Sequence, residues 1–328
     1  MNVSQIWAEL AAEAAAEGRF RRRIHQESVA DLYLVVEKPA NTRALLIDVD
    51  LSGVELGELP SGRGLDLCRV PATAGGEALE LVLSKPSFAD LFDTLVIDVA
   101  KAAAAGVDKA DVAARVTERV RRWQRFLRGS STGLTPERQR GLFGELFFLR
   151  TILLGAVPAF TAVQAWVGPH GRPQDFAFGE VAVEVKTTIG AQPQLLRIAS
   201  ERQLDTTALK HLALYQLSLD AREGAGQTLP DMIAEVRKRL QDPMAADIFE
   251  DRLFDADYLD AQAGVYRDGY TVRAAGIFLI GDGFPRLVES DCPPGVGDVE
   301  YSISVSALGP FIVDASVLVP IIREATGA

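Results

Sequence analysis

The clearest pattern in the chain is an alternation of apolar and charged positions over residues 181–186. This period of two predicts a β-strand whose valines all face one side, while Glu184 and Lys186 face the other side together with an alanine. The carboxylate and the amine then lie about 7 Å apart, because alternate residues of a strand share a face. A hairpin turn at Gly179 would bring Asp175, on the preceding strand, beside this pair.

The first 128 residues predict an α+β domain that ends in a basic helix. Alternating apolar runs and helix-forming segments follow each other in an order typical of a small sheet with helices packed on it. The expected helices cover 1–18, 87–105 and 108–127, and the expected strands cover 31–37, 43–50, 65–70 and 78–83. On the last helix, Trp123 and Phe126 are interpreted as core residues. The Gly- and Ser-containing segment 129–133 is the predicted linker.

Residues 129–328 predict a mixed β-sheet flanked by helices. Thr135 followed by Pro136 is typical of a helix start. The expected helices are 136–154, 201–209, 230–240 and 245–254. The expected strands are 163–167, 174–178, 181–187, 195–199 and 211–219, followed by a hairpin around 264–280 and by strands near 300–305 and 310–313. The predicted fold class is therefore α/β, with an α+β N-terminal domain (1–128) and an α/β C-terminal domain (129–328).

A single carboxylate interrupts the apolar helix predicted over 136–154. The run GLFGELFFL occupies residues 141–149 and is apolar over most of the helix surface, so this helix must be buried. Glu145 lies in the middle of the run. Burial of a carboxylate without a partner is costly, so we expect Glu145 to have a partner or a metal ion. Arg150 is an alternative partner, although a separation of five positions gives poor geometry on a helix.

Two carboxylates and one amine on neighbouring strands are typical of metal-dependent phosphodiester chemistry. The oxygens of Asp175 and Glu184 can hold a divalent cation, and Lys186 can orient or help to deprotonate a water. Ionised groups are rarely placed beside a core without a function. The alternative interpretation is an edge strand that carries a surface ion pair between Glu184 and Lys186.

Charge restricts the choice of function without deciding it. The net charge of −11 argues against a general nucleic-acid coat. Residues 112–140 nevertheless hold eight arginines against two glutamates, which makes them a candidate track for a phosphate backbone. A second arginine cluster lies at 19–23, and residues 242–260 are strongly acidic. Any one of these arginines can equally belong to a solvated helix face.

The remaining composition favours a soluble protein of the cytoplasm. The chain has no run of 18 or more apolar residues and no basic-then-apolar leader. Cys68 and Cys292 are too few and too far apart for a disulfide framework or a zinc cluster. We therefore expect a cytoplasmic protein without a membrane partner.

The predicted elements follow the order helix with a buried glutamate, strand, strand with Asp, strand with Glu-x-Lys, helix and strand. This order resembles the core of the PD-(D/E)XK nuclease superfamily. The motifs that carry the resemblance are GLFGELFFL (141–149), AWVGP (165–169), QDF (174–176), EVKTT (184–188) and IASERQL (198–204). Together they resemble a bacterial family of PD-(D/E)XK motif proteins encoded beside methyltransferase and helicase genes in restriction and phage-defence loci. The resemblance covers residues 135–220 and implies a restriction-endonuclease-like core.

The resemblance also implies roles for individual residues. It assigns Asp175, Glu184 and Glu145 as metal ligands, Lys186 as the group that positions the water nucleophile, and Gln203 as a further polar group of the site. Gln203 would open the helix predicted after the third of these strands. One departure is that Gln174 stands where the family usually has a proline, with Pro173 one residue earlier.

The leading interpretation is a Mg²⁺-dependent endonuclease that hydrolyses phosphodiester bonds in foreign DNA within a restriction or phage-defence system, with Mn²⁺ able to replace Mg²⁺. Its expected partners are DNA, the methyltransferase, helicase or ATPase subunits of such a system, and a second copy of the chain. The alternative is a nuclease-like subunit that no longer cleaves and that binds DNA or assembles a complex. RNA stays open as a substrate, because hydrolysis of the backbone does not require reading the sugar.

Overall fold

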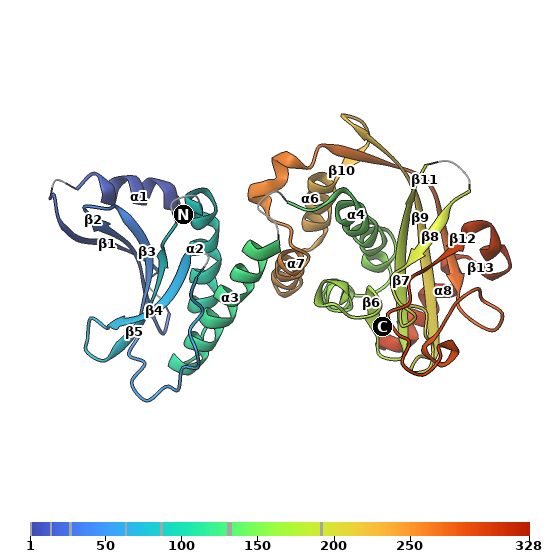
Figure 1. Ribbon diagram of the computed structural model, residues 1–328, viewed down its shortest axis with the longest axis horizontal. Coiled ribbons are helices and arrows are strands. Elements are labelled where there is room, and N and C mark those ends of the chain that lie inside the picture. Colours follow the sequence, from blue (N-terminus) through green and yellow to red (C-terminus); the bar gives the residue numbers. More distant parts are fainter. Residues whose placement is uncertain are drawn as a thin grey trace. The chain divides into compact units, whose positions relative to one another are not determined.

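The computed structural model describes residues 2–13, 15–25, 28–62, 64–85, 88–129, 133–190 and 193–328. The chain divides into two compact units, Met1–Ser131 and Thr132–Ala328 (Figure 1). Residues 130–132 of the predicted linker lie outside the described part of the chain. Each unit has its own sheet and its own hydrophobic core.

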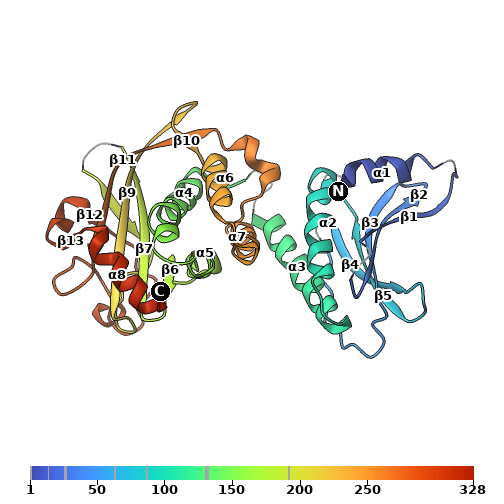
Figure 2. The same cartoon turned by 180° about the vertical axis from the view of Figure 1, so that it is seen from behind.

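The first unit is built on a five-stranded antiparallel sheet with the order β1-β2-β3-β5-β4. Its strands are β1 Gly18–His25, β2 Asp31–Lys38, β3 Thr42–Asp48, β4 Leu65–Pro71 and β5 Glu77–Leu83. Its helices are α1 Val3–Ala11, α2 Ala89–Ala104 and α3 Lys109–Gly129 (Figure 2). Asp108 begins α3 by accepting a hydrogen bond from the Asp111 N–H at 2.8 Å. Trp123 and Phe126 of this helix are buried, as predicted.

The first strand corrects the prediction for the N-terminus. A single helix over 1–18 is wrong, because α1 ends at Ala11 and Gly18 already pairs with Lys38 in the sheet. Gly18 is the first residue of β1, and a residue of an extended strand cannot belong to the same helix. The arginine cluster at 19–23 consequently lies on an edge strand. Its members pair with acidic side chains, Arg19 with Glu80, Arg21 with Asp48, Arg22 with Glu9 and Arg23 with Asp31.

The second unit contains a mixed sheet of six strands. They follow the order β10-β11-β9-β7-β6, and β13 also pairs with β11. Their bounds are β6 Phe176–Phe178, β7 Val181–Ile189, β9 His211–Glu223, β10 Gln227–Thr228, β11 Asp268–Leu279 and β13 Ile312–Val313. A separate antiparallel pair consists of β8 Leu195–Ile198 and β12 Tyr301–Ser304. Since β7 lies between β6 and the parallel strand β9, it is not the edge strand of the alternative interpretation.

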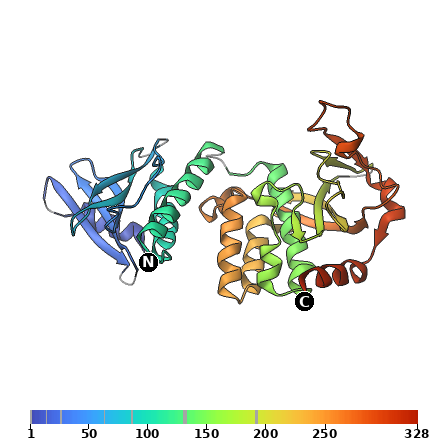
Figure 3. The same ribbon diagram turned by 90° about the horizontal axis from the view of Figure 1, so that it is seen from below.

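Both faces of this sheet are covered. Helices cover one face, with α4 to α7 side by side in Figure 3. The helices of this unit are α4 Pro136–Thr151, α5 Ala159–Gln164, α6 Leu229–Arg239, α7 Pro243–Asp255 and α8 Ala315–Thr326. Val181, Val183 and Val185 pack into the core on the helical face, while Ala182 packs with residues of β8 and β12 on the other. The alternation predicted for 181–186 is confirmed, except that both faces are buried.

Three of the elements predicted for this unit are wrong in type. The strand predicted over 163–167 is the end of α5 followed by one isolated bridge, from Trp166 to Phe176. The helix predicted over 201–209 is a series of turns. The hairpin predicted around 264–280 is a 3-10 helix followed by the single long strand β11, which pairs with β9 along its length. Helix α8 lies outside the predicted elements and contains Pro320, although proline is unfavourable inside a helix.

Short 3-10 helices connect the elements of the second unit. They are η2 Leu153–Gly155, η3 Gly168–His170, η4 Asp260–Val265, η5 Glu289–Asp291 and η6 Val305–Phe311. Within the part of the chain that the structure describes, every helix is too short or too polar to span a bilayer.

Two glycines of α4 allow a direct test of how closely this helix packs on β7. A Cβ at Gly144 would meet the Thr187 methyl at 2.4 Å, whereas a Cβ at Gly141 would meet nothing within 4 Å. We expect Gly144→Ala to lower the free energy of unfolding by roughly 1–3 kcal/mol, because the added methyl overpacks the contact. Gly141→Ala should raise it by up to about 1 kcal/mol, since alanine is the better helix former.

The measurement is urea unfolding of both variants beside the wild type. A Gly144→Ala protein as stable as the Gly141→Ala protein would contradict the close packing of α4 on β7.

Candidate active site

Asp175 directly precedes β6 and lies against the middle of β7. The ladder between the two strands covers three residues and ends at Val183. Beyond it, Asp175 Oδ2 accepts a hydrogen bond from the Val185 N–H at 2.8 Å. The carbonyl oxygen of Asp175 accepts from the N–H groups of Val167 and Gly168 at 2.8 and 2.9 Å. Asp175 is thus held by its side chain on one strand and by its backbone on the loop after α5.

Lys186 links β7 to the turn that follows β8. Its Nζ donates to Glu184 Oε1 at 2.7 Å and to Gln203 Oε1 at 2.9 Å. The Gln203 oxygen also accepts from the Ala199 N–H at 2.9 Å, so the backbone of the turn sets the orientation of this amide. Glu184 is 1% exposed, and its Oε2 has no hydrogen-bond partner among the described residues. An ammonium has three N–H donors, so Lys186 retains one beyond these two contacts.

Glu145 reaches the same region from α4. Thr135 caps this helix by accepting from the Arg138 N–H at 3.3 Å, as the sequence predicts. Glu145 Oε2 accepts a hydrogen bond from the Trp166 indole N–H at 2.6 Å. Arg150, the alternative partner, pairs instead with Glu235. The half-buried carboxylate is therefore held by a neutral donor and keeps its full charge when ionised.

Gly168 shows how closely two of the carboxyl groups approach each other. A Cβ at this position would meet Asp175 Oδ1 at 2.8 Å and Glu145 Oε2 at 3.3 Å. Both oxygens therefore face the same small space, which the absence of a side chain at Gly168 leaves open.

The three carboxyl groups resist ionisation where they lie. Burial raises the pKa of Glu184 to about 8 and that of Asp175 to about 6. Burial, and then the charge of Asp175, raise the pKa of Glu145 well above its ordinary value. The charge of Lys186 lowers all three pKa values and only partly offsets these effects. The three carboxyl groups therefore favour their protonated forms, and a bound cation would stabilise their ionised forms.

This set of donors fits a divalent cation. Carboxylate oxygens are preferred ligands of Mg²⁺, Glu184 Oε2 is buried without a partner, and Gly168 leaves space beside Asp175 and Glu145. In the conformation seen here, no three Asp, Glu, His or Cys side chains of the described residues are arranged to coordinate one ion. Glu184 Oε1 faces Lys186, whereas Glu184 Oε2 has no hydrogen-bond partner among the described residues.

All five residues predicted for the site lie in this region, although the setting of Gln203 differs from the prediction. No helix follows β8, and Gln203 lies in a turn. Gln174, at the position of the expected proline, donates from Nε2 to the carbonyls of Arg202 and Gln203 at 3.1 and 3.2 Å. Trp166, part of the AWVGP motif, contacts a site carboxylate. The sequence alone does not distinguish a tryptophan that donates to a site carboxylate from a tryptophan that only packs in the core.

The charged segments noted in the sequence are largely paired within their own units. The arginine track on α3 contains the pairs Arg115–Asp111, Arg119–Asp98 and Arg125–Glu118. The acidic segment 242–260 contributes the pairs Asp257–Arg138, Asp255–His170, Glu250–Arg237 and Asp260–Arg237. A role of the arginines at 112–140 in binding a phosphate backbone stays a prediction.

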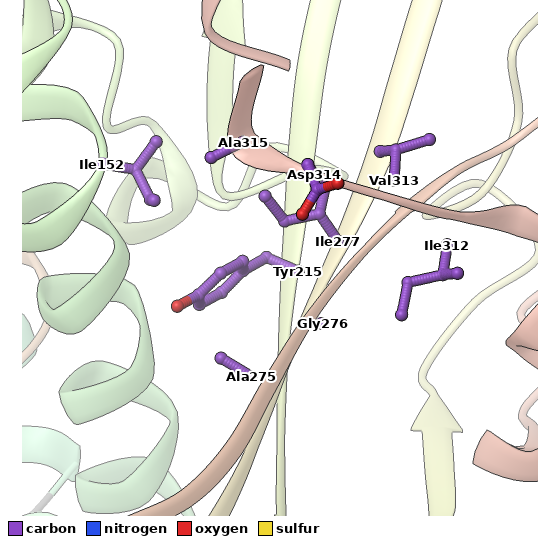
Figure 4. Close-up of a pocket in the computed structure, with 9 residues that line it drawn as sticks. All are labelled: Ile152, Tyr215, Ala275, Gly276, Ile277, Ile312, Val313, Asp314 and Ala315. Atoms are coloured by element: carbon purple, nitrogen blue, oxygen red, sulfur yellow. The ribbon is translucent and has the colours of Figure 1, made fainter. Parts of the chain in front are cut away.

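A cavity of about 350 Å³ lies elsewhere on the second unit, between β9, β11, β13 and the ends of α4 and α8 (Figure 4). Its side-chain polar groups are the Tyr215 hydroxyl and the Asp314 carboxylate, and burial raises the pKa of Tyr215. The residues that line it include none of the five site residues. This cavity is therefore not part of the candidate active site.

A family model described as "Putative PD-(D/E)XK family member, (DUF4420)" matches residues 3–306. The match includes the helix with Glu145, the turn that carries Asp175, and the strand with Glu184 and Lys186. The chain belongs to this family. No curated protein and no solved structure matches it. Members of the PD-(D/E)XK superfamily are generally nucleases and typically use divalent metals.

The raised carboxyl pKa values predict how the stability of this PD-(D/E)XK protein depends on pH. Because the folded pKa of Glu184 is about 8 against an ordinary value of 4.5, the folded state binds this proton more tightly than the unfolded state does. The contribution of Glu184 to the free energy of unfolding is fully present below pH 4.5 and is lost as the pH rises toward 8. The loss should approach about 1.4 kcal/mol per pH unit within this window.

Glu184→Gln should remove this contribution and be more stable than the wild type at the upper end of the window in metal-free buffer. The measurement is the free energy of unfolding in urea across the window, with Glu180→Gln, an exposed glutamate paired with Lys210, as the control. Identical pH profiles for wild type and Glu184→Gln would show that Glu184 is not desolvated as the structure indicates.

Proposed function

We propose that the protein is a Mg²⁺-dependent deoxyribonuclease that hydrolyses phosphodiester bonds within DNA. The observation that carries this proposal is the contact of Lys186 with both Glu184 and Gln203, next to a second and a third carboxyl group. The family membership supports it, because PD-(D/E)XK proteins are generally nucleases.

Each site residue has a distinct task in this proposal. Asp175, Glu184 and Glu145 would hold a divalent cation, which polarises a phosphoryl oxygen and water when bound. Lys186 uses its remaining N–H to orient the attacking water or to neutralise a phosphate oxygen. Gln203 keeps the ammonium of Lys186 directed into the site, since its own oxygen is fixed by the backbone of the turn.

The DNA substrate and the cellular setting rest on the resemblance noted from the sequence. We propose a place in a restriction or phage-defence system, with methyltransferase, helicase or ATPase subunits as partners and a homodimer as the assembly that would cut both strands. A second candidate is a nuclease-like subunit that binds DNA without cleaving it. The observation that favours it is that, among the described residues, no three side chains are arranged for one ion.

Substitution of Lys186 separates chemistry from metal binding. Lys186→Ala should lower the cleavage rate by roughly 10²-fold or more, because the group that positions or helps to deprotonate the water is lost. It should leave metal binding largely intact, since lysine is not a ligand. Glu184→Ala should lose both cleavage and metal binding.

The assay is cleavage of plasmid, linear and single-stranded DNA with Mg²⁺, Mn²⁺ or EDTA, beside the melting temperature with and without Mg²⁺. Lys210→Ala is the matched control, because Lys210 is exposed and pairs with Glu180 outside the site. A wild type that cleaves none of the substrates and shows no metal-dependent shift would favour the non-cleaving subunit.

A further inference from the structure

Two arginines lie on the loops that carry the candidate active site. Arg172 precedes Asp175 by three positions, in the loop between η3 and β6. Arg202 directly precedes Gln203, in the turn between β8 and β9. Neither belongs to the arginine track on α3 or to the cluster on β1.

One glutamine side chain joins these two loops. Gln174 lies two positions after Arg172, and its Nε2 donates to the carbonyl oxygens of Arg202 and Gln203 at 3.1 and 3.2 Å. These are the same loops that hold Asp175 against β7 and Gln203 against Lys186. The loop that carries Arg172 and the turn that carries Arg202 are thus joined directly beside two site residues, Asp175 and Gln203.

The two side chains are available for a ligand. Arg172 is exposed and has no hydrogen-bond or ion-pair partner among the residues that the structure describes. Arg202 has a side chain that is 56% exposed, and its contacts to Glu201 and Asp298 are long, at 3.5 and 3.9 Å. Exposed ion pairs of this kind typically contribute less than about 1 kcal/mol to stability. An anionic ligand can therefore replace the carboxylate partners of Arg202.

Other arginines of this unit are engaged in tighter contacts. Arg138 pairs with Asp257 at 2.8 Å, and Arg237 lies between Glu250 and Asp260 at 2.7 and 2.8 Å. The chain as a whole has a net charge of −11, and three of its carboxyl groups lie in this site. A polyanionic ligand can therefore approach this region only where local cations offset the repulsion.

We propose that Arg172 and Arg202 form a clamp for the phosphodiester backbone of the DNA strand at this site, an inference that rests on the proposed function. Guanidinium groups suit this ligand because their planar N–H groups can contact two phosphate oxygens at once. Contacts of this type position a strand without reading its sequence. With Gln174 as the joint, the clamp and the residues of the reaction belong to the same two loops.

The test is binding of a fluorescently labelled DNA duplex in EDTA, which measures affinity without cleavage. Arg172→Ala and Arg202→Ala should each weaken binding roughly tenfold at low salt and reduce the slope of log K against log salt by about one unit. Arg172→Lys should retain most of the slope, because it keeps the charge. Arg267→Ala is the control, since Arg267 is 74% exposed and pairs with Glu223 at 3.8 Å outside these loops.

Single-stranded DNA and RNA of the same sequence serve as further probes, and equal losses on all three would support a contact to phosphate. Unchanged slopes in both alanine variants, or an equal loss in Arg267→Ala, would overturn the clamp, as would a wild type that binds none of the probes. A wild type that cleaves DNA while both slopes stay unchanged would refute the clamp alone. A reduced slope in both alanine variants, together with a wild type that cleaves no DNA, would refute the nuclease and support the clamp.

Discussion

The burial of the Glu184 carboxylate beside Lys186, on a sheet that is covered on both faces, is the constraint on which the rest of the site depends. A buried ionised group requires partners, and one ammonium cannot satisfy three carboxyl groups in a desolvated region. Burial raises the pKa values of Glu184, Asp175 and Glu145 for this reason. The three carboxyl groups can be ionised together only when a cation balances their charge, and otherwise they retain protons.

The surrounding fold holds the residues of the site in place. Because β6 begins only at Phe176, the Val185 N–H donates to the side chain of Asp175. The turn after β8 directs the oxygen of Gln203 at Lys186, and Gln174 ties that turn to the loop before β6. Three separate segments are thus joined by hydrogen bonds between side chains and backbone groups and by one hydrogen bond between two side chains. Such bonds are specific in direction and hence suited to positioning.

The sequence predicts the strands and helices of the site better than its turns. The alternation over 181–186 and the isolated Glu145 in an apolar helix are local patterns, and each has a direct structural consequence. The hydrogen bond from Trp166 to Glu145 and the one from Gln174 to the turn at Gln203 depend on contacts between distant segments. Local propensity contains no information about such contacts, which explains why a helix was predicted where the turn lies.

The most direct test of the account is a crystal structure of the protein soaked with Mn²⁺, with data collected at an energy where manganese scatters anomalously. The account predicts one strong peak within about 2.0–2.6 Å of oxygens from Asp175 and Glu184, on the side of Gly168. The peak should be absent from Glu184→Gln crystals soaked in the same way. A wild-type structure without a peak at these carboxylates, with the Lys186–Glu184 pair unchanged, would contradict the central claim that this cluster is built to hold a divalent cation.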